Sequence, residues 1–318
     1  MRHIHLIDTS IASDNLGDEI IVSEARKHID RIIGDAYISS SSGHDGLGHY
    51  GRQLAADADL VLLLGTNALS AKYQRRGNFV WSVGRKDISV LEGKVVLLGV
   101  GASTTNTVVH PRQARLLRRL LSPHLKHSVR DETGKAILES VGLPVINTSC
   151  PTLWRYRSEA LDIPTGGAPS VCFTLTKHKA SSEDATFVAS LRECYGKLYF
   201  WPQQKRDLDY LRSITTTDDI EIVPGNLAAY DALLERENID VIGTRLHGGI
   251  RGLLHGRRSL VIEIDNRARD IGAETGLPTQ KRDALGPELI AKIRDGFETK
   301  LTIPMANVDT YLKQLVAR

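Results

Sequence analysis

The turn that follows residues 241–243 combines several groups suited to binding an anion. Residues 240–256 read DVIGTRLHGGIRGLLHG, and Arg245, Leu246 and His247 fall where a strand gives way to a helix. The first turn of a helix has free backbone N–H groups and the positive end of the helix dipole, so it favours an anion. An arginine there adds a bidentate donor, and a histidine can carry a proton. The alternative is a glycine-rich helix packed tightly on a sheet, with Arg245 paired to a carboxylate.

A second arginine stands at the end of another short strand. In SVRDETG, residues 128–134, Arg130 ends the strand and Asp131 begins a turn. Ligands bind at the carboxyl ends of the strands in open parallel sheets, so we expect Arg130 to project toward such a site. A structural Arg–Asp bridge at the turn is the competing interpretation.

The first strand leads into a turn that contains Asn15, Gly17 and Asp18, within the sequence SDNLGDEII. Asn and Gly shape tight turns, and the helix dipole favours an acid in the first helical turn. These three residues are therefore candidates for substrate binding, with a purely local role as the alternative.

Other motifs predict less. The GxG at 99–101 lacks the third glycine of a dinucleotide fingerprint, so it is a weak cofactor signal. His44 and His49 share a glycine-rich loop, but no third ligand is near in sequence and we expect no metal site. Asp207 and Asp209 resemble the DxD of metal-dependent glycosyltransferases, yet they fall at a predicted helix start, where capping is the simpler account.

Short apolar runs that alternate with helical patterns must position these turns. Continuous aliphatic runs at 60–64 and 95–100 predict strands covered on both faces, as in parallel sheets. The stretch 150–169 contains three Pro and two Gly without periodicity, so the crossover between domains is expected there. We predict an α/β protein with two Rossmann-like domains whose parallel sheets face a cleft. Residues 1–150 are the expected acceptor side and 151–318 the donor side, and the last helix could pack back on the first domain.

The composition limits the class of protein. A chain of 318 residues is long enough for about two domains, and 41% hydrophobic with 25% charged residues is typical of globular proteins. The net charge of +3 is too small to indicate a nucleic-acid groove or a polybasic anchor. The stretch 114–127 is basic, and a helix with a solvated arginine face is the favoured interpretation.

Three features predict a cytoplasmic location. The three cysteines lack CxxC spacing, which favours a reduced compartment over a zinc site or a disulfide framework. The first residues enter a strand-like run rather than a secretory leader. No apolar run reaches 18 residues, so no transmembrane segment is expected.

Four segments of the chain, in their order and in the distances between them, resemble the polysaccharide pyruvyl transferases. They are an Asn-x-Gly-Asp turn at 15–18, a Ser-x-Arg-Asp element at 128–131, a Cys-Pro-Thr segment at 150–152 and the Arg-Leu-His motif at 245–247. The resemblance implies a glycosyltransferase-B-like fold. It also implies transfer of the pyruvyl group of phosphoenolpyruvate onto two hydroxyls of a sugar, which forms a ketal in a bacterial-type envelope polysaccharide or exopolysaccharide.

The resemblance also implies roles for individual residues. Arg130, Arg245, Leu246 and His247 would line the phosphoenolpyruvate site, with His247 as an acid or a base. The donor carries a carboxylate and a phosphate, two anions that suit two arginines and a helix N-terminus.

One segment departs from the family pattern. Many members carry a lysine where this chain reads IDNRARDIG over 264–272. We expect Arg267 or Arg269 to replace that lysine as an anion contact.

The expected partners are phosphoenolpyruvate and a saccharide or lipid-linked saccharide acceptor. The implied chemistry requires no metal and no nucleotide cofactor, and no nucleic acid is expected. A lipid-linked acceptor would bring the protein into peripheral contact with the inner face of the membrane. Two other functions stay open, namely a nucleotide-sugar-dependent glycosyltransferase of the same architecture and a non-catalytic glycan-binding relative.

Overall fold

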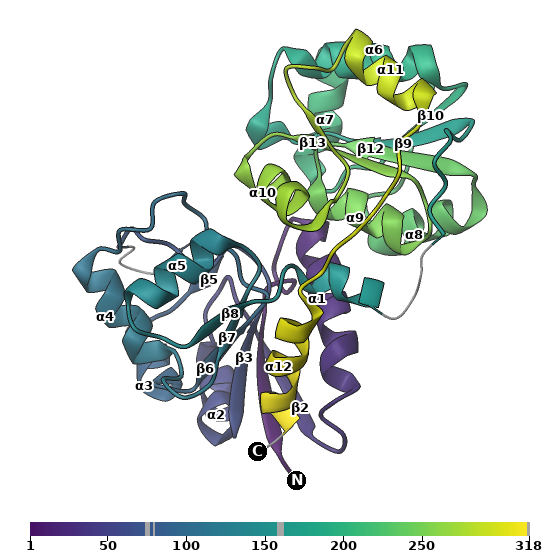
Figure 1. The fold of residues 1–318 in the computed structure, drawn as a ribbon. Coiled ribbons are helices and arrows are strands. Elements are labelled where there is room, and N and C mark those ends of the chain that lie inside the picture. The colour runs from purple at the N-terminus through teal and green to yellow at the C-terminus, as the bar shows by residue number, and fades with distance from the viewer. Residues whose placement is uncertain (74–76, 79, 158–161, 317–318) are drawn as a thin grey trace. The chain divides into compact units, whose positions relative to one another are not determined.

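The protein folds into two compact units, each an α/β structure on a parallel sheet, which confirms the predicted fold class (Figure 1). The computed structural model describes all residues except 74–76, 79, 158–161 and 317–318. Unit 1 consists of Met1–Ser13, Ile21–Arg157 and Ile303–Arg318, and unit 2 of Asp14–Ile20 and Ser158–Thr302. The chain passes from unit 1 to unit 2 after residue 157, within the stretch 150–169.

A short segment near the N-terminus also belongs to unit 2. Residues 14–20, which include the Asn-x-Gly-Asp turn, belong to unit 2 although they follow the first strand. The reason is packing, because Ile20 is fully buried in a cluster with Trp201 and other apolar side chains of unit 2.

The sheet of unit 1 has the strand order β2-β1-β3-β6, and all its strands are parallel. Its strands are β1 (His3–Asp8), β2 (Tyr37–Ser42), β3 (Leu60–Leu64) and β6 (Val95–Leu98). The aliphatic run of β3 is buried on both faces, since Val61 and Leu63 join one core cluster and Leu60, Leu62 and Leu64 the other. Helices cover both faces, as the run predicts.

The remaining elements of unit 1 surround this sheet (Figure 1). They are α1 (Leu16–Asp30), whose first turn lies in unit 2, α2 (Gly48–Asp57), β4 (Gly77–Asn78), β5 (Trp81–Ser82), α3 (Arg85–Leu91), α4 (Pro111–Leu120), β7 (His127–Val129), α5 (Glu132–Ser140), β8 (Val145–Asn147), η1 (Pro151–Arg157) and α12 (Met305–Val316). Helix α12 returns to unit 1, where the Tyr311 hydroxyl donates to the carbonyl of Leu97 at 2.9 Å.

The sheet of unit 2 has the order β11-β10-β9-β12-β13-β14. Its strands are β9 (Ser170–Thr174), β10 (Lys197–Phe200), β11 (Ile220–Ile222), β12 (Ile239–Gly243), β13 (Ser259–Glu263) and β14 (Thr279–Lys281). The chain runs from β9 to β10 on one side and later places β12 on the other. The loops that leave β9 and β12 therefore diverge, and such a switch point is where ligands bind in open parallel sheets.

Helices connect these strands, and α9 lies close against the sheet. The helical elements are η2 (Lys177–Lys179), α6 (Glu183–Cys194), α7 (Lys205–Ile214), α8 (Leu227–Arg236), α9 (Leu246–Leu254), α10 (Asn266–Thr275) and α11 (Pro287–Asp295). A Cβ at Gly252 would lie 2.6 Å from a methyl group of Val241, and one at Gly243 would lie 2.6 Å from the backbone of Thr174. Glycine at 252 lets the later part of α9 pack against β12, and glycine at 243 lets the end of β12 approach the end of β9.

Buried histidines in unit 1 make its stability depend on pH. Burial lowers the pKa of His5 and of His127 to about 4, and both side chains are fully buried. Protonation then favours the unfolded state, where the pKa is about 6.5, so stability is constant above pH 6.5 and falls as the pH drops toward 4. We expect each of the two histidines to lower the free energy of unfolding by about 2 kcal/mol at pH 5 relative to pH 7.

Urea unfolding at pH 7 and pH 5 measures this loss. His127→Leu should remove its share of the difference between the two pH values, whereas His49→Gln, at an exposed histidine, should leave the difference unchanged. Equal pH dependence in the wild type and His127→Leu would contradict the prediction.

Candidate functional site

Arg245 stands at the N-terminus of α9 and forms a buried ion pair with Asp207. Its Nε lies 3.0 Å from Asp207 Oδ2 and its Nη2 lies 2.7 Å from Oδ1, and Nη2 also donates to Gln204 Oε1 at 2.6 Å. The side chains of Arg245 and Asp207 are 6% and 0% exposed. The expectation of an open arginine fork is therefore revised, because the Nε and Nη2 edge is occupied. None of the hydrogen bonds between Arg245 and the described residues uses Nη1.

Asp207 joins three elements around Arg245. It accepts hydrogen bonds from the backbone N–H groups of Lys177 and Gln204, both at 3.0 Å. The second of these bonds is part of a capping box at the start of α7, which confirms capping for this carboxylate. The sequence analysis did not identify Asp207 as the partner of Arg245. The strand order could have indicated this pair, because Asp207 follows β10 and Arg245 follows β12, the two strands that flank β9.

The first turn of α9 offers backbone donors. The backbone N–H groups of Leu246 and Gly248 make no hydrogen bond to the residues that the structure describes. Gln203 Oε1 lies beside them, buried and without a partner in the described structure, 3.3 Å from where a Cβ of Gly248 would be. His247 belongs to this turn and is 6% exposed. The turn thus combines unused amides with a sheltered imidazole.

Positive charge gathers around this helix start. Burial lowers the pKa of Arg245 and nearby Arg267 lowers it further, whereas Asp207 raises it. Burial also lowers the pKa of His178, and the charges of Arg245 and Arg267 add to that effect. His178 follows β9 at the switch point and was missed by the sequence analysis. The lowered pKa keeps the His178 imidazole in its neutral form, which is the form that can take up a proton, so His178 joins His247 as a candidate proton carrier.

The two arginines expected to replace a lysine differ in their surroundings. Arg267 lies within electrostatic range of Arg245, and its Nη2 pairs with Asp265 at 2.6 Å. Arg269 is 62% exposed and pairs with its neighbour Asp270 at 3.0 Å. The structure therefore brings Arg267, rather than Arg269, toward the start of α9.

The Asn-x-Gly-Asp turn docks onto Gln203. Asn15 Oδ1 accepts from Gln203 Nε2 at 2.7 Å and from the backbone N–H of Gly17 at 3.1 Å. A Cβ at Gly17 would lie 2.6 Å from Gln203 Nε2, so glycine permits this approach. Asp18 is 7% exposed in the same turn. Gln203 thus connects this turn with the start of α9, two segments far apart in sequence.

Arg130 in unit 1 has a donor that no described residue uses. Its side chain is 2% exposed, and Nη2 donates to Asn67 Oδ1 at 2.5 Å. Nη1 is buried and has no hydrogen-bond partner among the described residues. Asp131 caps α5 instead, accepting from the backbone of Gly134 at 2.7 Å and of Ala102 at 3.1 Å. An unsatisfied buried guanidinium nitrogen is costly, which points to a ligand role.

The sequence analysis did not identify as site residues Gly101 and Asn67, which both lie against Arg130. A Cβ at Gly101 would lie 2.5 Å from Arg130 Nε and 2.7 Å from Asn67 Oδ1, so only glycine leaves this arrangement undisturbed. Thr66, which precedes Asn67, has a φ of 59°, a strained conformation for a β-branched residue. The GxG at 99–101 was the signal for Gly101, although it was considered for a dinucleotide.

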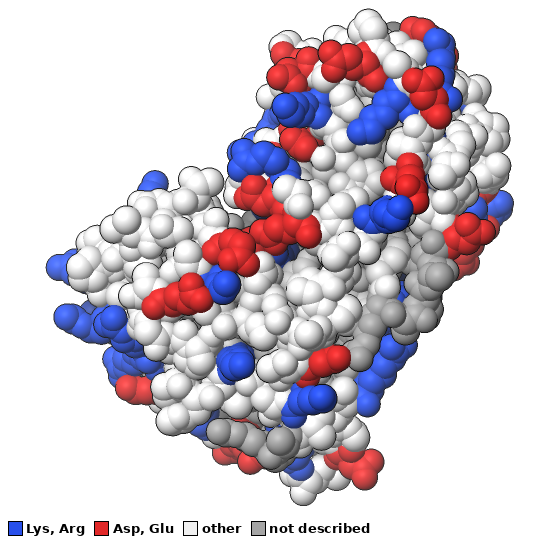
Figure 2. Space-filling model, in the orientation of Figure 1, with Lys and Arg blue, Asp and Glu red and all other residues white. Residues whose placement is uncertain are grey.

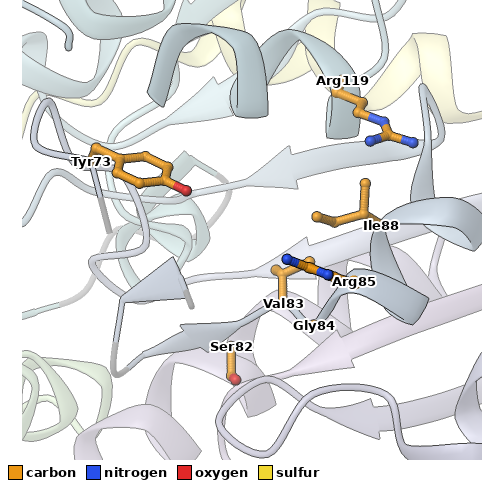
Figure 3. Close-up of a pocket in the computed structure, with 7 residues that line it drawn as sticks. All are labelled: Tyr73, Ser82, Val83, Gly84, Arg85, Ile88 and Arg119. Carbon is orange, nitrogen blue, oxygen red and sulfur yellow. The ribbon is translucent and has the colours of Figure 1, made fainter. Parts of the chain in front are cut away.

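A cavity of about 960 Å³ in unit 1 lies next to other residues (Figure 3). Its lining consists of Tyr73, Ser82, Val83, Gly84, Arg85, Ile88 and Arg119. None of the motif residues belongs to this lining, so the cavity is separate from the candidate site.

The described residues offer neither a metal-binding cluster nor a membrane-spanning helix. No group of three or more His, Cys, Asp and Glu side chains among them could hold a metal ion. No helix within the described part of the chain is long and apolar enough to cross a membrane.

Comparisons with known proteins agree with this architecture. A family model for polysaccharide pyruvyl transferases matches residues 15–266. No curated protein sequence matches the chain at a significant level. Among solved structures, the UDP-GlcNAc 2-epimerase of Methanocaldococcus jannaschii has a TM-score of 0.54 and 11% identity, with 99% of this chain and 98% of that chain covered.

Two further structures are similar over the same length. The same epimerase in complex with UDP-GlcNAc and UDP has a TM-score of 0.51 and 12% identity, with 99% and 98% covered. The glycosyltransferase SnogD from Streptomyces nogalater has a TM-score of 0.44 and 12% identity, with 99% and 94% covered. At this identity the epimerase likeness shows the fold alone, and it agrees with the predicted glycosyltransferase-B-like class.

Proposed function

Because the chain belongs to the polysaccharide pyruvyl transferase family, we propose that it transfers the pyruvyl group of phosphoenolpyruvate onto two hydroxyls of a sugar. The product is a pyruvate ketal in an envelope polysaccharide or exopolysaccharide. The observation that carries this proposal is the start of α9, where backbone amides without a partner among the described residues lie with His247 near the charges of Arg245 and Arg267. A helix N-terminus with adjacent cations suits a phosphate.

We assign the phosphate of the donor to the backbone amides of Leu246 and the rest of the first turn of α9. Within unit 1, Arg130 Nη1 is a separate candidate contact for an anion, because a guanidinium group suits a carboxylate or phosphate oxygen. Arg245 holds the turn through Asp207 and acts mainly as a positioning residue, with Nη1 as its remaining donor.

The acceptor side of the site is assigned to the turn that docks on Gln203. Asn15, Gly17 and Asp18 are the proposed substrate-binding residues there, and Arg267 is the proposed substitute for the family's lysine. The carboxylate and amide of this turn can accept and donate hydrogen bonds to sugar hydroxyls.

Ketal formation requires two additions at C2 of the donor. A proton adds to the methylene carbon, and the oxygen of the first sugar hydroxyl bonds to C2 and loses its proton. The C2–O bond to phosphate then breaks, inorganic phosphate leaves, and the second hydroxyl bonds to C2 and also loses its proton. Protonation of the methylene carbon and removal of the two hydroxyl protons are tasks for a general acid or base, and we assign them to His247.

A mass-spectrometric assay tests the function directly. The purified protein, phosphoenolpyruvate and a panel of glycosides should give a product with the ketal mass increment and one phosphate released per ketal. Detection of a product with a single enolpyruvyl group on one hydroxyl would replace the ketal as the product of the reaction. No product with any acceptor, together with thermal stabilisation by a nucleotide sugar and none by phosphoenolpyruvate, would overturn the proposal in favour of a glycosyltransferase. Saturable glycan binding without turnover of any donor would indicate a non-catalytic relative.

A further inference from the structure

One segment of unit 1 concentrates positive charge that the net charge of the chain conceals. The 38 residues between Glu92 and Asp131 contain five Arg and two Lys and no Asp or Glu. The whole chain has a formal net charge of only +3. This segment without acidic residues includes α4, and four of its five arginines lie on that helix.

Helix α4 separates its apolar and basic residues. Ala114, Leu117 and Leu120 are buried in the core of unit 1. The arginines at 112, 115, 118 and 119 are all exposed. Of these four, only Arg119 forms an ion pair with a described residue, at 3.1 Å from Glu92. Most of this charge is therefore not neutralised by the protein itself.

Helix α3 extends the basic surface. Arg85 and Lys86 are exposed in its first turn. Arg85, from α3, and Arg119, from α4, line the same cavity, so both helices place an arginine at it (Figure 3). Lys and Arg side chains gather over α3 and α4 in the space-filling view (Figure 2). We define the basic surface as the exposed basic residues of the two helices, namely Arg85, Lys86, Arg112, Arg115, Arg118 and Arg119.

An exposed apolar side chain lies beside the basic surface. Val108, just before α4, is 80% exposed, whereas Val109 packs against the core. Two hydrogen bonds shape the loop that carries Val108. The backbone N–H of Val108 donates to Asn106 Oδ1 at 2.9 Å, and the backbone N–H of Asn106 donates to Thr104 Oγ1 at 3.1 Å. These turns present Val108 to the outside.

We propose that the basic surface binds the anionic headgroups of a lipid bilayer, with Val108 inserted at the headgroup level. Clusters of exposed basic residues are attracted to anionic lipid headgroups, and the exposed Val108 lies next to this cluster in the sequence. A nucleic-acid surface would use the same charge, but it gives no role to an exposed valine. Membrane binding through this surface is independent of the transfer reaction, so either proposal can fail alone.

Each basic residue near an anionic membrane strengthens binding by about fivefold. Removal of two arginines should therefore weaken binding by about 25-fold, and their reversal to glutamate by more. The effect should shrink as salt increases, because salt screens exposed charges.

Vesicle co-sedimentation of the full chain tests the proposal. We expect binding to phosphatidylcholine vesicles that contain phosphatidylglycerol and little binding to phosphatidylcholine alone. The double variant Arg112→Glu/Arg115→Glu should lose at least 25-fold in binding. The control Arg236→Glu/Arg294→Glu changes the net charge equally at exposed arginines of unit 2 and should bind as the wild type does. Circular dichroism melts verify that both variants are folded.

A second variant separates lipid from other polyanions. Val108→Ser should weaken binding to the anionic vesicles severalfold and leave any binding to duplex DNA unchanged. Equal binding to neutral and anionic vesicles, an equal loss in the control pair, or binding to DNA without binding to vesicles would each overturn the proposal.

Discussion

Substitution of His247 by alanine or glutamine should lower the turnover of phosphoenolpyruvate by about 10²- to 10⁴-fold, the usual contribution of a general acid or base. His247 lies in the first turn of α9 and is 6% exposed, which places a sheltered imidazole at the proposed phosphate site. Steady-state release of phosphate in the presence of an acceptor measures the loss. The pH profile of the residual activity adds the role, because the limb that disappears identifies acid or base.

His255 provides the matched control. It lies at the other end of α9, where Nε2 pairs with Asp231 at 3.2 Å. His255→Gln should leave turnover within about twofold of the wild type, since it is a partly exposed polar substitution away from the site. An equal loss in both variants, or more than a tenth of the activity left in His247→Ala, would show that His247 is not the proton carrier.

Asp207→Ala should destabilise the protein by about 3–5 kcal/mol, because it leaves the buried guanidinium of Arg245 without its partner. The substitution also removes the acceptor of the backbone N–H groups of Lys177 and Gln204. For a unit of about 150 residues this loss corresponds to a decrease in Tm of roughly 6–20 °C. Thermal melts followed by circular dichroism measure it.

Two variants separate charge pairing from other effects. Asp209→Ala alters the second carboxylate of the same DxD, which is exposed, and should change stability by about 0.5 kcal/mol or less. The double variant Asp207→Leu/Arg245→Met should recover much of the lost stability, since apolar residues can replace a buried ion pair at little cost. It should still lack activity. Full stability in Asp207→Ala alone would contradict a structural role for the pair.

The sequence predicts strands where burial and local pattern agree. The run LVLLL is strand β3 and is buried on both faces, because only a strand covered by helices on both sides needs such a run. Strand β2 was missed, since YISSSS has no apolar run and its side chains are only partly buried at the edge of the sheet. Edge strands depend on their backbone pairing more than on apolar side chains.

The sequence places the motifs after strands, as the structure does, but it does not identify the residues that pair with them. Asp207 lies 38 residues from Arg245, and Asn15 lies 188 residues from Gln203. Nothing in the local pattern around Arg245 distinguishes an open anion clamp from a buried ion pair. Strand order decides it, because β10 and β12 flank β9 and bring Asp207 to Arg245.

The sequence by itself determined the class of this protein, its alternation of strands and helices and the family to which its four motifs point. These features follow from local periodicity and from the order of short motifs along the chain. Only the tertiary structure decided which groups are engaged and which are available. It pairs Arg245 with Asp207, leaves Arg130 Nη1 without a partner in the described structure and joins the Asn-x-Gly-Asp turn to unit 2. Burial and hydrogen bonding between distant segments are properties of packing, which no local pattern specifies.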